Sequence, residues 1–304
     1  MRLAFFGTPA AAVPALHAFM AAPDVTVAAV VTNPDRPAGR GYTMTPPPVK
    51  EAAQEAGLPV WQPGKPREIL DELAGLGVDA CAVVAYGSLL PADVLAVGGA
   101  GFVNLHFSLL PAWRGAAPVA HSILHGETET GVTCFVLEAG MDTGPVLLAE
   151  RTWIGEGETA GELTARLATV GAPLLVAAVS GLVDGSLTAV PQDHERATYA
   201  PKLSADDARL DWGADAADVA AAVRAFNPMP GAHTTFAGAR LKVHRGVAVA
   251  GSGEPGVVRV AEDGPVVACG GGALRLDEVQ PAGRPRMSGT AFVNGYRPDG
   301  HRLG

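Results

Sequence analysis

The chain has 304 residues, of which 48% are hydrophobic and 17% charged, so its composition excludes an intrinsically disordered protein and is typical of globular domains. This length favours two domains over one. The formal net charge of −9 argues against a surface that is basic throughout, as in many nucleic-acid-binding proteins. Residues 240–304, however, hold nine Lys and Arg against six Asp and Glu, so a phosphate-rich partner that touches only this segment is compatible with the sequence.

The first half of the chain alternates apolar runs of strand length with helix-like segments. In chain order, strands are expected at 2–7, 24–32, 78–86, 103–108, 131–138 and 144–152, and helices at 10–22, 47–57, 66–77, 117–126 and 159–185. Thr159, followed three residues later by Glu162, has the pattern of a capping box at the start of the last helix. Buried strands that alternate with helices predict an α/β domain with a Rossmann-like, mostly parallel sheet.

The pattern changes after residue 190. Residues 191–207 are polar and interrupted by two prolines, so we expect a linker there. A helix is expected next at 215–228, and five short strands are expected at 232–238, 239–249, 253–264, 265–272 and 273–283. Closely spaced strands of this kind predict a small β-barrel like the oligonucleotide-binding fold. The expected organisation is a first domain at 1–190, a linker at 191–207 and a second domain at 208–304.

Several common motifs are missing from the sequence. The strand at 2–7 is not followed by G-x-G-x-x-G, and neither a P-loop nor a G-x-S-x-G element occurs, which argues against dinucleotide enzymes and serine hydrolases. The three cysteines lie far apart in apolar runs, so we expect buried thiols in a reducing compartment and no metal site. The most apolar stretch, 171–183, is interrupted by Gly and Ser and is too short for a membrane span, so we expect a cytoplasmic protein.

The strand expected at 103–108 carries a polar residue at every second position. Asn104, His106 and Ser108 would share one face of this strand, while the alternating apolar residues share the other. For any one of these polar residues, exposure to solvent is an adequate explanation. Together they suggest a face equipped for chemistry, at the end of a strand where ligands of open α/β sheets bind.

A second polar element is the loop around Asp142, which lies between Gly140 and Gly144. The glycines would let the loop turn tightly and bring the carboxylate to His106, although a turn-forming Asp is a simpler reading of this residue alone. Jointly, Asn104 could donate to a developing oxyanion, His106 could transfer protons, and Asp142 could fix the imidazole's tautomer and charge. The sequence offers no activated Ser or Cys, so the nucleophile would come from the substrate.

Two of these motifs resemble a known signature. "VNLHFSLLPAWRGAAPV" (103–119) together with "GMDTGPVL" (140–147) is similar to the N-x-H-x-S-L-L-P element and later Asp of folate-dependent formyltransferases. The resemblance continues through "VVTNPDRPAGRG" (30–41), "VAYGSLLP" (84–91) and the C-terminal "FNPMPGAHTTFAGARLKVHR" (226–245). This full-length pattern resembles the methionyl-tRNA formyltransferase family.

The resemblance implies transfer of formyl from 10-formyltetrahydrofolate to the α-amino group of methionyl initiator tRNA, for translation initiation. Asn104 and a protonated His106 would stabilise the oxyanion, and Asp142 would keep His106 charged and relay the amine proton. The folate would contact six residues: Ser108, Leu109, Leu110, Pro111, Tyr86 and Gly87. No metal is implied.

The resemblance also implies where tRNA would bind. The segment 33–48 contains prolines and glycines that are expected to exclude a regular helix or strand, so it would form a long exposed loop. In the family this loop meets the tRNA acceptor end, and Arg40 matches its key arginine; Arg36 in the same loop is a further expected tRNA contact. Members often have lysines where this chain has Tyr42 and Thr43. Lys242 and Arg245 would add phosphate contacts from the second domain.

Two groups of alternatives remain open. A sugar-nucleotide formyltransferase would share much of this pattern, whereas a purine-pathway enzyme would end near residue 190–210 and a folate dehydrogenase would be much longer. An RNA-binding protein without catalytic activity belongs to a different class, and the presence of Asn104, His106 and Asp142 weighs against it. We expect the protein to be an enzyme and a monomer.

Overall fold

The computed structural model describes residues 1–38 and 43–304. The chain forms two compact units, which are described separately. The first unit contains Met1–Gly115, Thr130–Thr152 and Thr164–Tyr199, and the second contains Ala116–Glu129, Trp153–Leu163 and Ala200–Gly304. Each unit therefore draws on more than one stretch of the chain. The boundaries expected at 190 and 208 stay a prediction.

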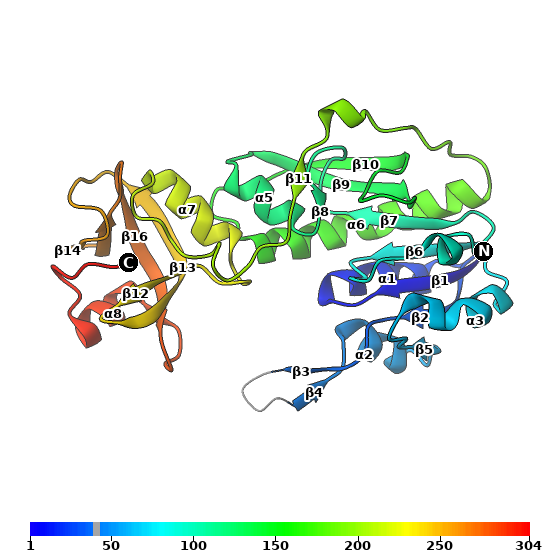
Figure 1. The fold of residues 1–304 in the computed structure, drawn as a ribbon, viewed down its shortest axis with the longest axis horizontal. Coiled ribbons are helices and arrows are strands. Elements are labelled where there is room, and N and C mark those ends of the chain that lie inside the picture. Colours follow the sequence, from blue (N-terminus) through cyan, green and yellow to red (C-terminus); the bar gives the residue numbers. More distant parts are fainter. Residues whose placement is uncertain (39–42) are drawn as a thin grey trace. The chain divides into compact units, whose positions relative to one another are not determined.

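The first unit is built on a seven-stranded sheet in the order β10-β9-β7-β6-β1-β2-β5 (Figure 1). Its strands are β1 (Arg2–Gly7), β2 (Thr26–Val31), β5 (Val60–Trp61), β6 (Ala80–Val84), β7 (Phe102–His106), β9 (Glu129–Val136) and β10 (Val146–Trp153). The pairs from β5 to β7 are parallel, and β9 runs antiparallel to β7. Every residue of β6 is buried, and so is every residue of β1 and β2 after the first. This burial explains the continuous apolar runs in the sequence of these strands. The predicted Rossmann-like α/β domain is confirmed.

Helices and short elements connect or follow these strands. They are η1 (Ala10–Ala12), α1 (Val13–Ala21), α2 (Pro48–Glu55), η2 (Pro66–Ile69), α3 (Leu70–Gly75), α4 (Ala92–Leu95), β8 (Arg114–Gly115), η3 (His194–Arg196) and β11 (Tyr199–Ala200). Phe6, Val31, Val83 and Phe102, from four neighbouring strands, form part of one buried apolar cluster. The core thus fixes the strand ends that carry the polar residues.

Helix α6 (Ala160–Val183) is a single 24-residue helix that matches the helix expected at 159–185 and contains the apolar stretch at 171–183. By length and composition alone α6 would suffice to cross a membrane, with 44% of its most apolar window buried in the protein. Its buried residues include Leu163, Leu167 and Leu175, and burial of this face accounts for its apolar composition. The predicted capping box is confirmed: the backbone N–H of Thr159 donates to Glu162 Oε2 at 2.9 Å, and the N–H of Glu162 donates to Thr159 Oγ1 at 3.3 Å.

The segment 33–48 differs from the expected irregular loop. Two short strands, β3 (Arg36–Ala38) and β4 (Thr43–Thr45), pair antiparallel, with Arg36 opposite Thr45 and Pro37 opposite Met44. Proline lacks a backbone N–H but is compatible with the edge of a sheet, and each strand of a two-stranded ribbon is an edge. The prediction that these residues exclude a strand was therefore wrong at both ends of the loop.

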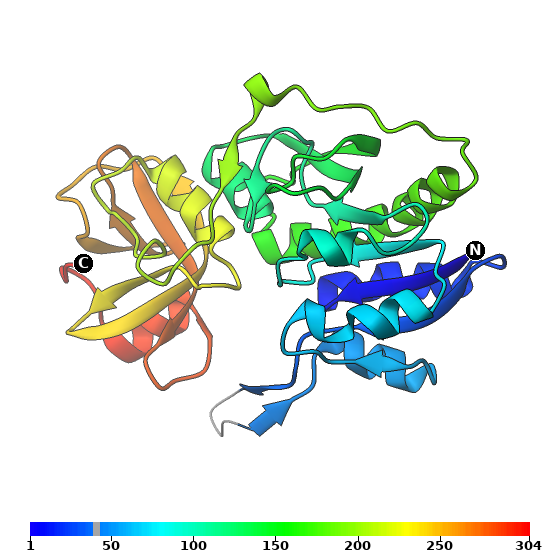
Figure 2. The ribbon, with the colours of Figure 1, turned by 45° about the vertical axis from the view of Figure 1, so that its right-hand side comes forward.

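The sheet of the second unit is antiparallel, in the order β12-β13-β16-β15-β14, with β17 paired to β16. It forms a half-barrel, drawn from yellow to red in Figure 2. Its strands are β12 (His233–Phe236), β13 (Ala239–Val249), β14 (Val258–Ala261), β15 (Gly264–Ala268), β16 (Ala273–Pro281) and β17 (Met287–Ser288), and its helices are α5 (Pro118–Leu124), α7 (Ala216–Ala225) and α8 (Gly289–Tyr296). Trp212, Phe236, Val243, Leu276 and Phe292 belong to its buried core. The five strands expected from the sequence are all present.

Candidate active site

Strand β7 presents two polar side chains at successive positions of one face. Asn104 pairs with Val83 of β6 and Phe135 of β9, and His106 pairs with Thr133 of β9. Because residues two apart in a strand point the same way, the side chains of Asn104 and His106 lie on the same side of the sheet. Asn104 is half-buried and His106 only 6% exposed. The shared face expected from the sequence is therefore present for Asn104 and His106, whereas Ser108 lies beyond the end of β7, and the chemical role of this face stays a prediction.

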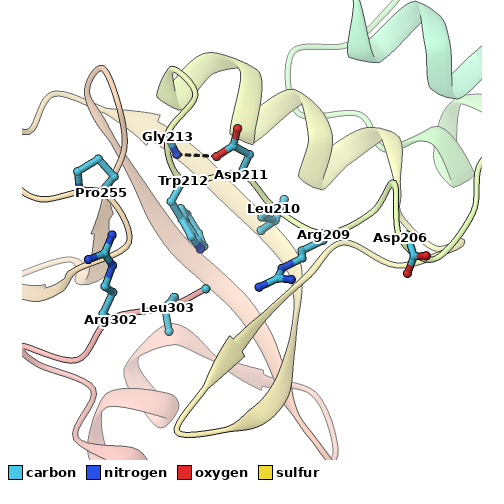
Figure 3. A pocket seen from close by; sticks show the side chains of 10 residues that line it. Asp206, Arg209, Leu210, Asp211, Trp212, Gly213, Pro255, Arg302 and Leu303 are labelled. Carbon is cyan, nitrogen blue, oxygen red and sulfur yellow. Dashed lines mark hydrogen bonds between the residues drawn. The ribbon is translucent and has the colours of Figure 1, made fainter.

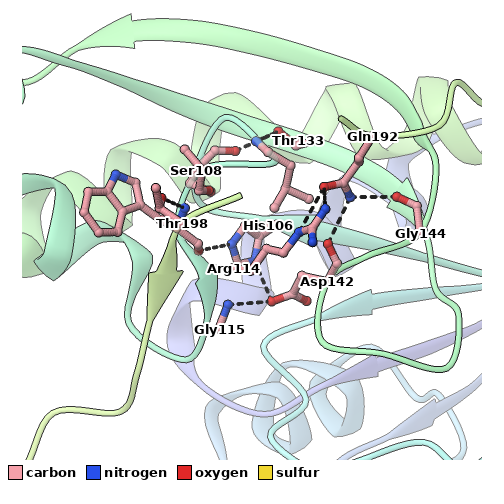
Figure 4. Close-up of polar contacts among 12 residues, drawn as sticks. His106, Ser108, Arg114, Gly115, Thr133, Asp142, Gly144, Gln192 and Thr198 are labelled. Carbon is pink, nitrogen blue, oxygen red and sulfur yellow. Dashed lines mark hydrogen bonds and ion pairs between the residues drawn. The ribbon is translucent and has the colours of Figure 1, made fainter. Parts of the chain in front are cut away.

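The imidazole of His106 has one hydrogen-bonding partner and one charged neighbour (Figure 4). Its Nε2 lies 2.9 Å from the carbonyl oxygen of Trp113, and its Nδ1 lies 3.8 Å from Oδ2 of Asp142. A carbonyl can only accept, so Nε2 carries the hydrogen and donates it. The distance to Asp142 suits an ion pair but is too long for a direct hydrogen bond. The Trp113 carbonyl, which the sequence analysis missed, therefore sets the tautomer that we expected Asp142 to set.

Burial governs the charge of this imidazole. Desolvation lowers the pKa of His106, while the carboxylate of Asp142 and the hydrogen bond to Trp113 act in the opposite direction, and the net shift is downward. The downward direction favours the neutral imidazole, in which Nδ1 has its lone pair toward Asp142. This direction opposes our expectation that Asp142 keeps His106 charged, because the cost of burying the imidazolium exceeds the attraction of a carboxylate 3.8 Å away.

The structure brings Asp142 to His106 through a tightly turned loop. Asp142 has a backbone φ of +53°, and its Oδ2 accepts a hydrogen bond of 2.8 Å from the N–H of Gly115. Gly144 allows the approach, because a Cβ there would lie 1.8 Å from the carbonyl oxygen of Val136. The close turn expected from the flanking glycines is what positions the carboxylate.

Residues 108–112 form a turn directly after β7. Ser108 is fully buried and its hydroxyl donates to the Ala112 carbonyl at 2.6 Å, so this side chain shapes the turn. Thr133 Oγ1 donates to the Ser108 carbonyl at 2.7 Å and accepts from the Leu110 N–H at 3.1 Å. Leu109, Leu110 and Pro111 are half-buried. Thr133 is a supporting residue that the sequence analysis missed, although its position opposite His106 in the sheet follows from the strand register.

Tyr86 and Gly87 follow β6 at the carboxyl edge of the sheet. The Tyr86 ring packs edge-on against Phe6, and burial raises the pKa of its phenol to about 12. The Tyr86 carbonyl accepts hydrogen bonds from Thr8 Oγ1 at 2.8 Å and from Asn33 Nδ2 at 2.6 Å. Gly87 has a φ of +83°, which favours glycine. The side chain of Tyr86 therefore contributes to the core, and its predicted contact with folate stays a prediction.

Asn33 is a further residue that sequence reasoning missed. Its side chain donates to the Tyr86 carbonyl and accepts from Ser88 Oγ at 2.9 Å, so it connects the ends of β2 and β6. The signal was available, because Asn33 follows a buried parallel strand at the edge where ligands bind in such sheets. It braces the loop that contains Gly87.

Two of the arginines predicted to contact tRNA, Arg36 and Arg40, belong to the segment 33–48 that contains β3 and β4. Arg40 and Tyr42 lie outside the described residues, whereas Arg36 is exposed at the start of β3. Just before it, Asp35 forms an ion pair of 2.7 Å with Lys50, and this contact is the first cause of the lowered pKa of Asp35. The ion pair anchors the base of the ribbon.

Lys242 and Arg245 lie on β13 of the second unit. The register of β13 against β16 shifts around His244, so Lys242 lies opposite Gln280 and Arg245 opposite Glu278. Arg245 is half-exposed and forms a short ion pair with Glu162, whose pKa falls to about 2 chiefly through its hydrogen bonds to Thr159. Within the described parts of the chain, no carboxylate is paired with Lys242. The positive charge of Lys242 is therefore more available than that of Arg245 to pair with a phosphate group.

A separate pocket of about 750 Å³ lies in the second unit (Figure 3). It is lined by ten residues: Asp206, Arg209, Leu210, Asp211, Trp212, Gly213, Pro255, Arg302, Leu303 and Gly304. None of the predicted site residues is among them. The indole N–H of Trp212 is already bonded to Thr234, so the pocket wall belongs to the folded core.

Comparison with known proteins shows the family to which this chain belongs. The formyl transferase family matches residues 1–179, and the formyl transferase C-terminal domain matches residues 202–297. A methionyl-tRNA formyltransferase of Streptomyces griseus is 47% identical over 301 residues, 98% of this chain and 97% of the relative. The chain therefore belongs to the formyl transferase family, in which it groups with the methionyl-tRNA formyltransferases. It is a transferase, as the resemblance predicted.

Solved structures extend the comparison of the fold. An N-formyltransferase from Helicobacter canadensis, in complex with folinic acid and dTDP-3-aminofucose, matches with a TM-score of 0.68 and 17% identity over 90% of this chain and 98% of that one. A methionyl-tRNA formyltransferase from Clostridium thermocellum matches with a TM-score of 0.60 and 14% identity over 82% and 94%. At these identities the likeness is one of fold. Among the described residues, no cluster of His, Cys, Asp and Glu suited to a metal ion occurs.

Proposed function

We propose that this chain transfers the formyl group of 10-formyltetrahydrofolate to the α-amino group of methionyl initiator tRNA in the cytoplasm. The observation that carries the proposal is the buried His106 facing the half-buried Asp142, with Asn104 on the same face of β7 as His106, in a family of formyl transferases. The reaction forms a bond between the amine nitrogen and the formyl carbon and breaks the bond from that carbon to N10 of the folate. One proton leaves the amine, and N10 gains one.

Asn104 acts on the formyl oxygen. Its side-chain amide has two N–H donors on the equipped face of β7, and it is the least buried residue of the strand. A donor aimed at the oxygen stabilises negative charge that develops as the amine attacks. Because the amide is neutral, its burial costs less than that of a charged donor.

His106 and Asp142 act on the proton of the amine. With the hydrogen of His106 on Nε2, its Nδ1 and the Asp142 carboxylate are two acceptors 3.8 Å apart. A neutral imidazole next to a carboxylate is a proton-accepting pair, and the imidazolium that forms is stabilised by the charge of Asp142. We therefore assign His106 as the base that takes the amine proton for delivery to N10. This role replaces that of a permanently charged donor.

The loops after β6 and β9 and the turn after β7 are the proposed folate contacts. Leu89 and Met141, on the first two of these segments, are 88% and 63% exposed. Such apolar side chains suit the faces of a pterin ring, while backbone groups of the same loops suit its polar edge. Gly87, Leu109, Leu110 and Pro111 complete this set through their backbone and apolar atoms. The side chains of Ser108 and Tyr86 support the backbone of these proposed folate-binding segments, because their polar atoms are buried inside the protein.

The proposed tRNA contacts are Arg36 and Arg40 in the segment between β2 and α2, with Lys242 in the second unit. Arg36 is exposed, and Asp35 beside it is neutralised by Lys50, so the positive charge of Arg36 is not cancelled by its neighbour. Arg245 is a weaker candidate because Glu162 competes for its guanidinium. We propose that the protein acts as a monomer.

The direct test is formylation of methionyl initiator tRNA by the purified chain with 10-formyltetrahydrofolate. Free methionine and an amino-sugar nucleotide serve as competing acceptors, because the Helicobacter canadensis enzyme with the same fold was solved with such a sugar. Formylation of the tRNA alone supports the proposal. Preference for the amino sugar would transfer the assignment to that class, and tRNA binding without any transfer would favour a non-catalytic RNA-binding protein.

A further inference from the structure

Gln192 lies in the segment expected to be a linker, yet it is only 8% exposed and every hydrogen-bonding site of its amide is used. Its Nε2 donates to the carbonyl oxygens of Asp142 at 2.9 Å and Gly144 at 2.7 Å. Its Oε1 accepts from Nε and Nη2 of Arg114 at 3.2 and 2.6 Å (Figure 4). Because all its donors and acceptors are hydrogen-bonded, this amide has a fixed orientation. Its two donors hold the backbone of the loop that carries Asp142.

Arg114 is the anchor of this amide. Its side chain is 2% exposed, and its Nη2 lies 3.0 Å from Nδ1 of His194. The residues on either side of Arg114 hold the catalytic pair: the Trp113 carbonyl accepts from His106, and the Gly115 N–H donates to Asp142. A single three-residue stretch therefore contacts the imidazole, the carboxylate and, through Gln192, the backbone behind the carboxylate.

The backbone of Asp142 needs such support. Its φ of +53° is in the left-handed region, which a non-glycine residue adopts at a cost and keeps only where neighbouring contacts impose it. The two hydrogen bonds from Gln192 fall on the carbonyls at and just after this residue, where they oppose relaxation of the turn. The carboxylate is already 3.8 Å from Nδ1 of His106, so relaxation would weaken the pair further.

We propose that Gln192, held by Arg114, is a positioning residue that fixes the Asp142 carboxylate opposite His106. The inference deepens the proposed function, because it assumes that this pair handles the amine proton. The charged or titratable groups of the cluster are Asp142, Arg114 and His194, and the ring of Phe135 packs edge-on against the imidazole. Among them, Asp142 is the group that raises the pKa of His106.

The first test is an NMR titration of the His106 imidazole in the full-length chain without substrates. In Gln192→Ala the loop that carries Asp142 can relax, which weakens the contact of its carboxylate with His106, so the pKa of His106 falls, in the same direction as in Asp142→Asn. Gln62→Ala is the matched control, because Gln62 also donates from Nε2 to a backbone carbonyl, that of Asn33, at 2.9 Å in the same unit. It leaves the His106 titration unchanged. A titration in Gln192→Ala equal to that of the wild type overturns the proposal.

The second test separates positioning of the loop from anchoring of the segment around Gln192. In Gln192→Glu the carboxylate still accepts from Arg114, but it cannot donate to the carbonyls of Asp142 and Gly144. We expect a folded protein whose kcat falls roughly 10- to 100-fold with little change in the KM for folate. Wild-type kcat in this variant contradicts the proposal. If the chain proves not to formylate tRNA, the titration of His106 still decides the positioning role, so the two failures are distinguishable.

Discussion

The polar residues on β7 and the basic residues on β3 and β13 differ in how they are held. His106 is 6% exposed and held by the Trp113 carbonyl at 2.9 Å, and a supported carboxylate faces it from the loop after β9. Arg36 is exposed, and Lys242 is half-buried without a paired carboxylate in the described residues. Desolvated, pre-oriented groups act strongly on a reacting atom, whereas solvated charges act weakly and in sum. The first region suits chemistry, and the second suits binding of a polyanion.

The sharpest test of this contrast is Asn104→Ala. Removing one oriented donor from a buried site is expected to lower kcat by about 10²–10³ while the KM for tRNA changes little. Steady-state formylation kinetics with saturating folate measure both quantities. If the variant instead raises the KM for tRNA and leaves kcat unchanged, Asn104 contributes to binding, and the proposed difference between the two regions is wrong.

Asp142→Asn tests the proton-accepting pair. The neutral imidazole is the active form of a base, so kcat/KM falls as the pH drops through the pKa of His106, which burial places below its ordinary value. Without the carboxylate that raises this pKa, the acidic limb of the profile moves to still lower pH, and the maximal rate falls about tenfold or more. A pH profile of kcat/KM from pH 5 to 9 gives both. Movement of the limb to higher pH would show that the imidazole works in its charged form.

The same contrast explains which parts of the fold and of the candidate site could be predicted from the sequence. Apolar runs and turn residues predicted the strands, because strands buried on both faces must be apolar. The alternation at 103–108 then identified Asn104 and His106 as candidate site residues. Trp113 escaped notice because its contribution is a carbonyl oxygen, which every residue type has. Gln192 escaped because it is distant along the chain and its segment is polar, so only the three-dimensional path reveals that it is buried. The ribbon at β3 and β4 was missed because local rules for proline describe edge strands poorly.

Glu162 is exposed, like the basic residues, but is held by several hydrogen bonds, like the polar residues on β7, so it tests a charge with properties of both regions. Its pKa of about 2, against an ordinary value of 4.5, means that its contribution to stability is present above about pH 4.5 and is lost as the pH falls toward 2. Glu162→Gln removes this dependence and costs about 1 kcal/mol at pH 7, reduced by solvent screening. Urea unfolding at pH 7 and pH 3 measures the effect. An equal loss of stability at both values would mean that the charge itself contributes nothing.

Lys242→Ala is expected to have the smallest effect, because one solvated contact with a phosphate contributes about 1 kcal/mol or less. The Kd for tRNA should rise severalfold at low salt, kcat should stay unchanged, and the slope of log K against log salt should fall by roughly 0.7–0.9 if one phosphate contact is lost. Arg245→Ala is the comparison, since its guanidinium is already paired with Glu162 and its removal should alter the slope less. Binding titrations at several salt concentrations give both slopes. If the two variants behave alike, the ion pair with Glu162 does not withhold Arg245 from the nucleic acid, and exposure alone determines which basic residues of β13 contribute.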